Sequence, residues 1–129
     1  MAHSIHPNYP EKHKENHKIK LNEGVGIKVN HNQRYCTDSI SGAIIKAIAE
    51  KSQVPYQEFV VKNDSPCGST IGPIITTNSG IKGCDIGCGQ WGMHSIRETC
   101  GVLDTVYYVE LMGGFFQNYE KIAPSLLKC

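Results

Sequence analysis

The sequence predicts an α/β fold in which strands and helices alternate along the chain. Residues 25–30 alternate as a strand does, residues 37–52 have the caps and period of a helix, and residues 59–61 form a second β-rich run. A strand, a helix and a strand in succession are typical of an α/β layer.

The composition is that of one globular domain. The 129 residues are 40% hydrophobic and 19% charged, which disfavours a disordered tail or a membrane protein. The 13 basic and 12 acidic residues leave a net charge of +1, so nucleic acid and membrane are not expected as partners. No apolar run approaches the roughly 20 residues of a membrane span, and the first twenty residues are too polar for a signal peptide. We therefore expect a cytoplasmic protein.

The first clear element is a strand that follows an irregular segment. Residues 1–24 show no period, so we expect a loop there. In residues 25–30, one face carries Val25, Ile27 and Val29, and the other face carries Lys28. Lys28 is thus predicted to point away from the apolar face.

The clearest helix follows this strand. Thr37, Asp38 and Ser39 are candidate N-caps, and Pro55 places the end of the helix near Ser52. Apolar residues recur at i, i+3, i+4, i+7 and i+8, which is the spacing of one helix face. They are Ile40, Ala43, Ile44, Ala47 and Ile48.

The second half contains a turn-rich loop, two short elements and a closing helix. Residues 63–73 are rich in turn formers, with Ser69 or Thr70 as the cap of a short helix through residues 74–75. We expect a strand at 83–86, then a glycine-rich loop at 87–92 that lets the backbone approach a ligand. Residues 102–119 have both helix and strand character, and their length favours a helix. No repeat or linker divides the chain.

The six cysteines are expected to be reduced and mostly buried, because no secretory signal accompanies them. They are Cys36, Cys67, Cys84, Cys88, Cys100 and Cys129.

Several residues have side chains suited to catalysis or metal binding, and spacing alone leaves their roles open. His13 and His17 lie four apart, Cys84 and Cys88 precede His94, and Cys67 lies in a turn. Each set is compatible with metal ligation or nucleophilic catalysis, and equally with ordinary surface or structural roles. His94 follows the glycine-rich loop and precedes Arg97 and Glu98, which suit the orientation of neighbouring groups. It is therefore a candidate metal ligand or a structural histidine.

Three blocks in order carry a family resemblance. They are Met-Ala-His-Ser-Ile-His-Pro-Asn-Tyr at 1–9, Asn-Asp-Ser-Pro-Cys-Gly-Ser-Thr-Ile-Gly-Pro at 63–73, and Met-His-Ser-Ile-Arg-Glu at 93–98. Together they resemble the M18 aspartyl aminopeptidases. Shorter matches at 27–30, 33–35 and 113–116 extend the resemblance over nearly the whole chain.

The resemblance implies a cocatalytic two-zinc aminopeptidase that releases Asp or Glu from the amino terminus of peptides. In that family, an α/β proteolytic domain is interrupted by a dimerisation domain, and the subunits form large homo-oligomeric shells. Residues 1–129 would be the carboxy-terminal portion of the proteolytic domain. The implied fold is a partial zinc-exopeptidase-like layer of mixed β-sheet packed with helices.

Four residues receive roles from the resemblance. His94 matches the last zinc ligand, while His3, Lys28 and Tyr35 match residues that contact substrate. A lysine can pair with the substrate's side-chain carboxylate, and a histidine or tyrosine can donate hydrogen bonds to the oxyanion of the tetrahedral intermediate. No catalytic residue is expected within this chain, because the general-base glutamate and the other zinc ligands belong upstream. One of those ligands, an aspartate, is expected immediately before Met1.

The zinc site implied by the family is therefore only partial here, which leaves three hypotheses. The first is that the chain is a fragment of a working zinc aminopeptidase. The second is a non-catalytic truncated paralogue that binds or assembles with full-length subunits. The third is an isolated enzyme with one zinc held by His94, His3 and His6. Residues 88–92 also depart from the proline-containing loop of the family, and Trp91 there is expected to be a packing anchor.

Overall fold

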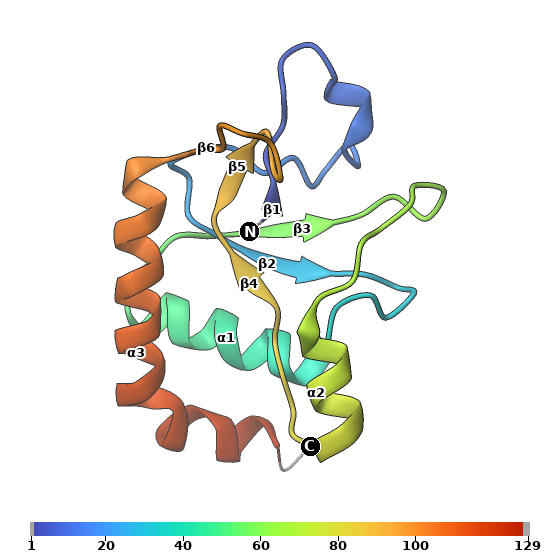
Figure 1. The fold of residues 1–129 in the computed structure, drawn as a ribbon. Coiled ribbons are helices and arrows are strands. Elements are labelled where there is room, and N and C mark those ends of the chain that lie inside the picture. Colours follow the sequence, from blue (N-terminus) through green and yellow to red (C-terminus); the bar gives the residue numbers. More distant parts are fainter. Residues whose placement is uncertain (1, 128–129) are drawn as a thin grey trace.

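The structure, a computed structural model, describes residues 2–127 as two small sheets with three helices (Figure 1). Its first sheet has the strand order β3-β2-β4 and its second has the order β1-β5-β6. The elements are β1 (Ala2–His3), the 3₁₀ turn η1 (Pro10–Lys12), β2 (Val25–Val29), α1 (Ser39–Lys51), β3 (Tyr56–Val60), α2 (Ile71–Ser79), β4 (Ile86–Gly87), β5 (Gly89–Trp91), β6 (Thr99–Cys100) and α3 (Val102–Leu126). The predicted α/β class with a mixed sheet is confirmed.

The central sheet is built on β2, which is parallel to β3 and antiparallel to β4. Helix α1 is the crossover between the two parallel strands and lies beneath them in Figure 1. The α1 N-cap is Asp38, whose carboxylate accepts a hydrogen bond from the Ser41 backbone N–H at 2.6 Å. The predicted helix is therefore confirmed with its cap.

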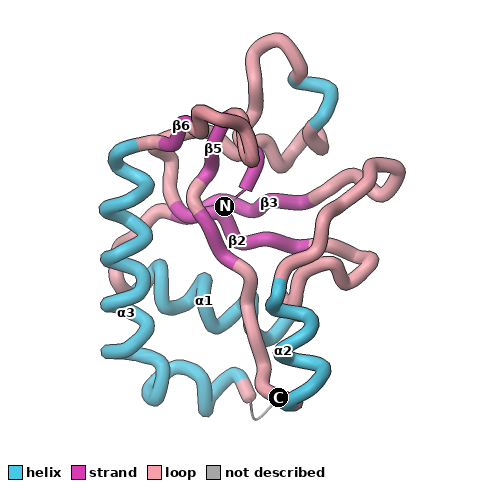
Figure 2. Tube along the Cα trace, in the orientation of Figure 1, coloured by secondary structure: helices cyan, strands magenta, loops and turns pink. Residues whose placement is uncertain are grey.

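The second sheet joins the start of the chain to residues 89–100. Strand β1 is parallel to β5, with His3 opposite Gln90, and β6 is antiparallel to β5. Figure 2 shows this sheet among loops, while the helices gather around the central sheet. Residues 87–92 are thus not a continuous loop as predicted, because residues 89–91 pair on both sides.

The core lies between the central sheet and the pair α1 and α3. Gly114 of α3 lets the two helices approach, since a Cβ there would lie 2.1 Å from the Ser52 hydroxyl oxygen. A side chain at this position would force the helices apart. The buried core residues here are Val25, Ile27, Ile44, Ile45, Ile48, Ala49, Val54, Leu111 and Ala123.

The start of α3 is tied to the segment before β2 by one carboxylate. Asp104 is fully buried, and it accepts hydrogen bonds from the backbone N–H of Asn22 at 2.7 Å and of Gly24 at 3.0 Å. The Asn22 side chain in turn accepts from the N–H of Leu103 at 3.0 Å. This contact fixes α3 relative to the loop that leads into the central strand.

Several predicted boundaries are wrong by a few residues. The strand predicted at 59–61 begins earlier, at Tyr56, because residues 56–60 pair with β2 along its whole length. The strand predicted at 83–86 is only Ile86–Gly87, with Gly83 making one isolated bridge. The segment predicted to be irregular contains β1 and η1, and the two predicted later helices are longer than expected.

Two helices expose apolar faces. On α3, Val102, Val106 and Val109 lie at i, i+4 and i+7 and are 79%, 48% and 66% exposed. On α2, Ile71 and Ile74 are also exposed. Such contiguous apolar surface is typical of regions that pack against another polypeptide. Within residues 2–127, no helix has the length and apolar character required to cross a membrane.

The cysteines within residues 2–127 are all free thiols, as predicted, but the prediction that most are buried is wrong, since only Cys88 is fully buried. Cys129 lies outside the described residues. Burial, followed by a hydrogen bond with the Asp85 carboxylate, raises the pKa of Cys36 to about 12. Burial raises the pKa of Cys84 to about 11. Cys100, by contrast, is exposed on β6.

These thiols are expected to differ in reactivity. With a pKa of about 12, only about one Cys36 molecule in 10,000 is thiolate at pH 8, and the thiolate is the nucleophile. Timed iodoacetamide labelling at pH 8, read by peptide mass spectrometry, should label Cys100 well before Cys36 and Cys84. Equal labelling rates for the three would contradict this burial pattern.

Candidate functional site

A groove of about 1000 Å³ is lined by residues of both sheets and their loops, from Ala2 to Glu98. All four residues predicted for the site line this groove: His3 from β1, Lys28 from β2, Tyr35 from the loop after β2, and His94 from the turn between β5 and β6. The fold therefore brings together side chains that are up to 91 positions apart.

Lys28 is buried on the groove side of β2 and is 7% exposed. Its Nζ lies 4.2 Å from the centre of the Tyr35 ring, and it has no ion pair within residues 2–127. Burial lowers the pKa of Lys28, although Asp85 and Cys67 partly oppose this effect. An ammonium held on a ring face, without a carboxylate partner, is suited to bind an anionic group that enters the groove.

Tyr35 is buried beside Lys28 and can donate a hydrogen bond into the groove. The Cys67 Sγ lies 3.4 Å from the Tyr35 hydroxyl oxygen and 3.2 Å from the Gly68 carbonyl oxygen, which compete for the single thiol hydrogen. Burial, together with the contact to Cys67, raises the pKa of Tyr35. Tyr35 thus stays a neutral donor near pH 7. Cys67 contacts this tyrosine, and no hydrogen bond joins its thiol to a histidine among the described residues.

His3 lies on β1 and lines the same groove. Burial lowers the pKa of His3, and the nearby His13, Lys28 and His94 lower it further. The backbone carbonyl of His3 is also fixed, because it lies 2.9 Å from His13 Nε2. A lowered pKa keeps the imidazole neutral near pH 7, with one ring nitrogen as a donor and the other as an acceptor.

His94 lies in a tight turn at the mouth of the groove. Its φ of 67° places it in the left-handed region, which is unusual for a residue with a side chain. Its backbone N–H donates to the Glu98 carboxylate at 2.5 Å, which holds the turn in place. The side chain remains exposed, as a ligand to an incoming group must be.

The metal hypotheses based on this chain alone are wrong. Within residues 2–127, no group of three or more His, Cys, Asp or Glu side chains is arranged to hold a metal ion. His3, His6 and His94 therefore do not form a zinc site, and Cys84 and Cys88 do not form one with His94.

The charge of the groove favours anions. Glu98 is the one carboxylate among the groove-lining residues, whereas Lys12, Lys28 and four histidines line the same space. An acidic ligand would meet mostly hydrogen-bond donors and positive charge there.

Asp85 was not identified from the sequence, although its hydrogen bonds hold together segments that line the groove. Its carboxylate accepts from the Cys36 backbone N–H at 2.8 Å and from the Thr70 hydroxyl at 3.0 Å. Its backbone carbonyl accepts from the Lys28 N–H at 2.8 Å. Asp85 thus connects β2, the loop after it and the start of α2. Only its place just before the glycine-rich segment indicated it in the sequence.

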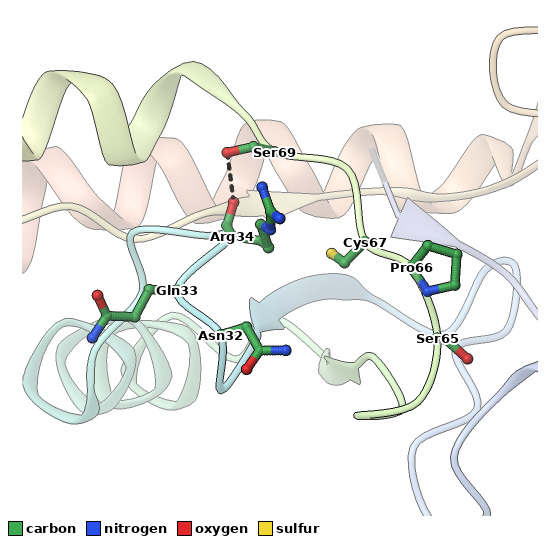
Figure 3. Close-up of a pocket in the computed structure, with 7 residues that line it drawn as sticks. All are labelled: Asn32, Gln33, Arg34, Ser65, Pro66, Cys67 and Ser69. Carbon is green, nitrogen blue, oxygen red and sulfur yellow. Dashed lines mark hydrogen bonds between the residues drawn. The ribbon is translucent and has the colours of Figure 1, made fainter.

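A smaller hollow of about 360 Å³ adjoins the groove across the 65–69 loop. Figure 3 shows this loop facing the 32–34 turn, with the Ser69 hydroxyl donating to the Arg34 carbonyl at 3.2 Å. The contact ties together the two loops that carry Tyr35 and Cys67. The lining residues are Asn32, Gln33, Arg34, Ser65, Pro66, Cys67 and Ser69.

Trp91 anchors the groove rim, as predicted. Its indole N–H donates to the Ile5 carbonyl at 2.8 Å, and its ring meets His6 edge-on at 5.8 Å between centroids. The ring is still 36% exposed, so it packs on the surface rather than in the core.

Comparison with known proteins gives consistent matches over the chain. Residues 1–116 match the family described as aminopeptidase I zinc metalloprotease (M18). A probable aspartyl aminopeptidase of Ricinus communis is 49% identical over 122 residues, which are 95% of this chain and 25% of the relative. This chain therefore spans about a quarter of that relative's length.

Solved structures share the fold. The structure of an Ape4 and Nbr1 complex matches with a TM-score of 0.90 and 46% identity, over 98% of this chain and 24% of that chain. The structure of a Saccharomyces cerevisiae mApe1 dodecamer matches with a TM-score of 0.84 and 28% identity, over 95% of this chain and 26% of that chain.

Proposed function

The chain belongs to the M18 family of aminopeptidases, and on that premise we propose that it is part of a zinc-dependent enzyme that releases amino-terminal Asp or Glu from peptides. We further propose that residues 1–129 are the carboxy-terminal portion of its proteolytic domain and that it is cytoplasmic. The single observation that carries the proposal is the groove: four residues matched to the family line one cationic space.

The groove suits an acidic amino-terminal residue. Lys28 lacks an anionic partner within the described residues, so a substrate carboxylate would supply one. A neutral residue of the same shape, such as Asn, would leave the buried ammonium unpaired. Acidic specificity follows from that difference in charge.

His3 and Tyr35 are suited to stabilise the reacting carbonyl. In peptide hydrolysis a water oxygen bonds to the carbonyl carbon, the C–N bond breaks, and a proton passes to the leaving amine. Negative charge develops on the carbonyl oxygen in between. A neutral imidazole and a neutral phenol that donate to this oxygen would lower the barrier.

The metal chemistry requires more than this chain. A bound zinc would polarise the scissile carbonyl and activate water, and His94 is the residue here that would help hold it. The other ligands and the general base would come from the remainder of a longer polypeptide. The length of the Ricinus communis relative, of which this chain covers 25%, is consistent with such a polypeptide.

The test is hydrolysis by the native protein that carries this segment. We expect Asp and Glu to be released from short peptides at least about 100-fold faster than Asn and Gln from matched peptides. The amide side chains of Asn and Gln lack the carboxylate that would pair with Lys28. Dialysis against a chelator should abolish release, and added Zn²⁺ should restore it. Equal rates on Asp and Asn peptides would contradict the acidic specificity, and full activity after chelation would contradict the zinc dependence.

The second candidate is a non-catalytic subunit that assembles with full-length family members. The exposed apolar faces of α2 and α3 are suited to contact with another polypeptide, as this candidate requires. The dodecameric state named for the mApe1 structure makes homo-oligomer formation part of either proposal. Size-exclusion chromatography with mass spectrometry of the native complex distinguishes the two. A 129-residue species inside a larger shell supports the second, and a single longer chain supports the first.

A further inference from the structure

Gln90 is buried in β5 and has no hydrogen bond to its side chain. The residue is 1% exposed, and neither its Nε2 nor its Oε1 has a partner within the described residues. Five buried side-chain nitrogen or oxygen atoms lack partners in residues 2–127, and four of the five belong to residues that line the groove. They are Ser4 Oγ, His13 Nδ1, and the two polar atoms of Gln90.

The position of Gln90 is fixed by the sheet. It lies directly opposite His3 in the β1–β5 pair, so the two side chains project from the same face. Both line the groove. On its other side Gln90 is paired with Cys100 of β6. The carboxamide is therefore held by a strand that is paired on both edges, not by a mobile loop.

The neighbouring groups do not satisfy this carboxamide. The amide lies close enough to Glu98 to help hold the pKa of that carboxyl below its usual range, after the larger effect of the His94 N–H. No hydrogen bond of normal geometry joins the two side chains, however. Two buried polar atoms without protein partners destabilise a fold, and such atoms are retained at sites where a ligand supplies the missing partners.

We propose that Gln90 is a substrate-contacting residue that determines specificity for acidic amino termini. Its Nε2 donates to the side-chain carboxylate of the substrate's first residue, and its Oε1 accepts from an N–H of the same residue. A carboxylate has about four acceptor positions, so Lys28 alone leaves some of them without a donor. This inference rests on the proposed function, which supplies the acidic substrate.

The test uses the native protein that carries this segment, with Gln90→Met and Gln90→Glu variants. Methionine keeps the length and approximate volume of glutamine but has no donor, and glutamate keeps the shape but replaces the donor with a negative charge. We expect kcat/KM on an Asp peptide to fall about 10- to 100-fold in Gln90→Met, and further in Gln90→Glu. Activity on the matched Asn peptide should fall less in Gln90→Glu, because only the acidic side chain is repelled.

Thermal unfolding separates this role from a structural one. If hydrogen bonds of the Gln90 side chain stabilised the fold, the Gln90→Met variant would unfold at a lower temperature. If that side chain has no partners in the free protein, the variant should have an equal or higher Tm. Added L-aspartate should raise the Tm of the unmodified protein and raise that of Gln90→Met much less. Unchanged kinetics in both variants, or a lowered Tm of Gln90→Met with an unchanged L-aspartate response, would overturn the inference.

The two proposals fail in different ways. If the unmodified protein neither cleaves Asp peptides nor responds to L-aspartate, the proposed function itself is wrong, and the Gln90 assignment is overturned with it. If the unmodified protein is active and both variants match it, the proposed function stands and only the Gln90 assignment is wrong.

Discussion

Replacing Lys28 with methionine is expected to remove the preference for acidic substrates while making the folded protein more stable. Lys28 is 7% exposed, its ammonium lies on the Tyr35 ring, and it has no ion pair within residues 2–127. A substrate carboxylate would be its partner, and loss of one member of such a buried pair costs about 2–5 kcal/mol. We therefore expect kcat/KM for Asp peptides to fall at least about 30-fold, with little change for neutral peptides.

Stability should change in the opposite direction. Methionine fills the space of the lysine stem and removes a buried charge, which we expect to raise the free energy of unfolding by about 1 kcal/mol after the lost cation–π contact is subtracted. Lys20→Met is the matched control, because that ammonium is on the surface and 59% exposed. It should leave both quantities unchanged. A destabilised Lys28→Met protein with intact acidic specificity would contradict both parts of the prediction.

The pH dependence of Lys28 has a defined sign. Burial lowers its pKa in the folded protein, so the unfolded chain binds more protons between the folded pKa and the unfolded value of about 10.4. The contribution of Lys28 to stability therefore rises with pH through that window, and it is least favourable below it. Urea unfolding at several alkaline pH values should show this rise in the unmodified protein, relative to Lys28→Met.

Replacing Asp104 with alanine is expected to cause the largest loss of stability. The carboxylate is fully buried and accepts from two backbone N–H groups, those of Asn22 and Gly24. Alanine would leave both donors without partners, at about 1–3 kcal/mol each, so we expect a loss of about 4 kcal/mol. A domain at the low end of ordinary stability, about 5 kcal/mol, would retain only about 1 kcal/mol. Chemical denaturation monitored by circular dichroism measures the change.

Asp104→Asn is the informative companion. It keeps one acceptor oxygen and the side-chain volume, so one of the two backbone bonds is retained. We expect it to lose about half as much stability as the alanine variant. If the alanine and asparagine variants were both as stable as the unmodified chain, the described link between α3 and the 22–24 segment would not stabilise the fold.

The sequence predicted those elements whose signals are local. The period of residues 40–48 and the cap at Asp38 are set by neighbours within one or two helical turns, so α1 was predicted with its cap. The alternation of residues 25–30 likewise predicted β2 and the two directions of its side chains. Strand limits were less accurate, because β3 and β5 are defined by their pairing partners, which are distant in sequence.

The site was predictable only in part, for the same reason. Family motifs indicated His3, Lys28, Tyr35 and His94, and the structure adds that they line one groove. Nothing in the local sequence shows that the Lys28 face of β2 is covered rather than solvated, and nothing shows that Gln90 is buried without partners. Both facts depend on the pairing of β1 with β5, which are more than 80 positions apart in the sequence.

The pairing of β1 with β5 also has a consequence for the order of folding. Residues 25–60 can form β2, α1 and β3 with contacts that are close in sequence, whereas the β1–β5 pair closes a loop of more than 80 residues. Because loop-closure entropy grows with the logarithm of loop length, this pair costs roughly 1 kcal/mol more to close than the β2–β3 pair, and it is expected to form later. We therefore expect the groove to form after the β2–α1–β3 unit, so that a chain with only this unit folded would lack a binding site.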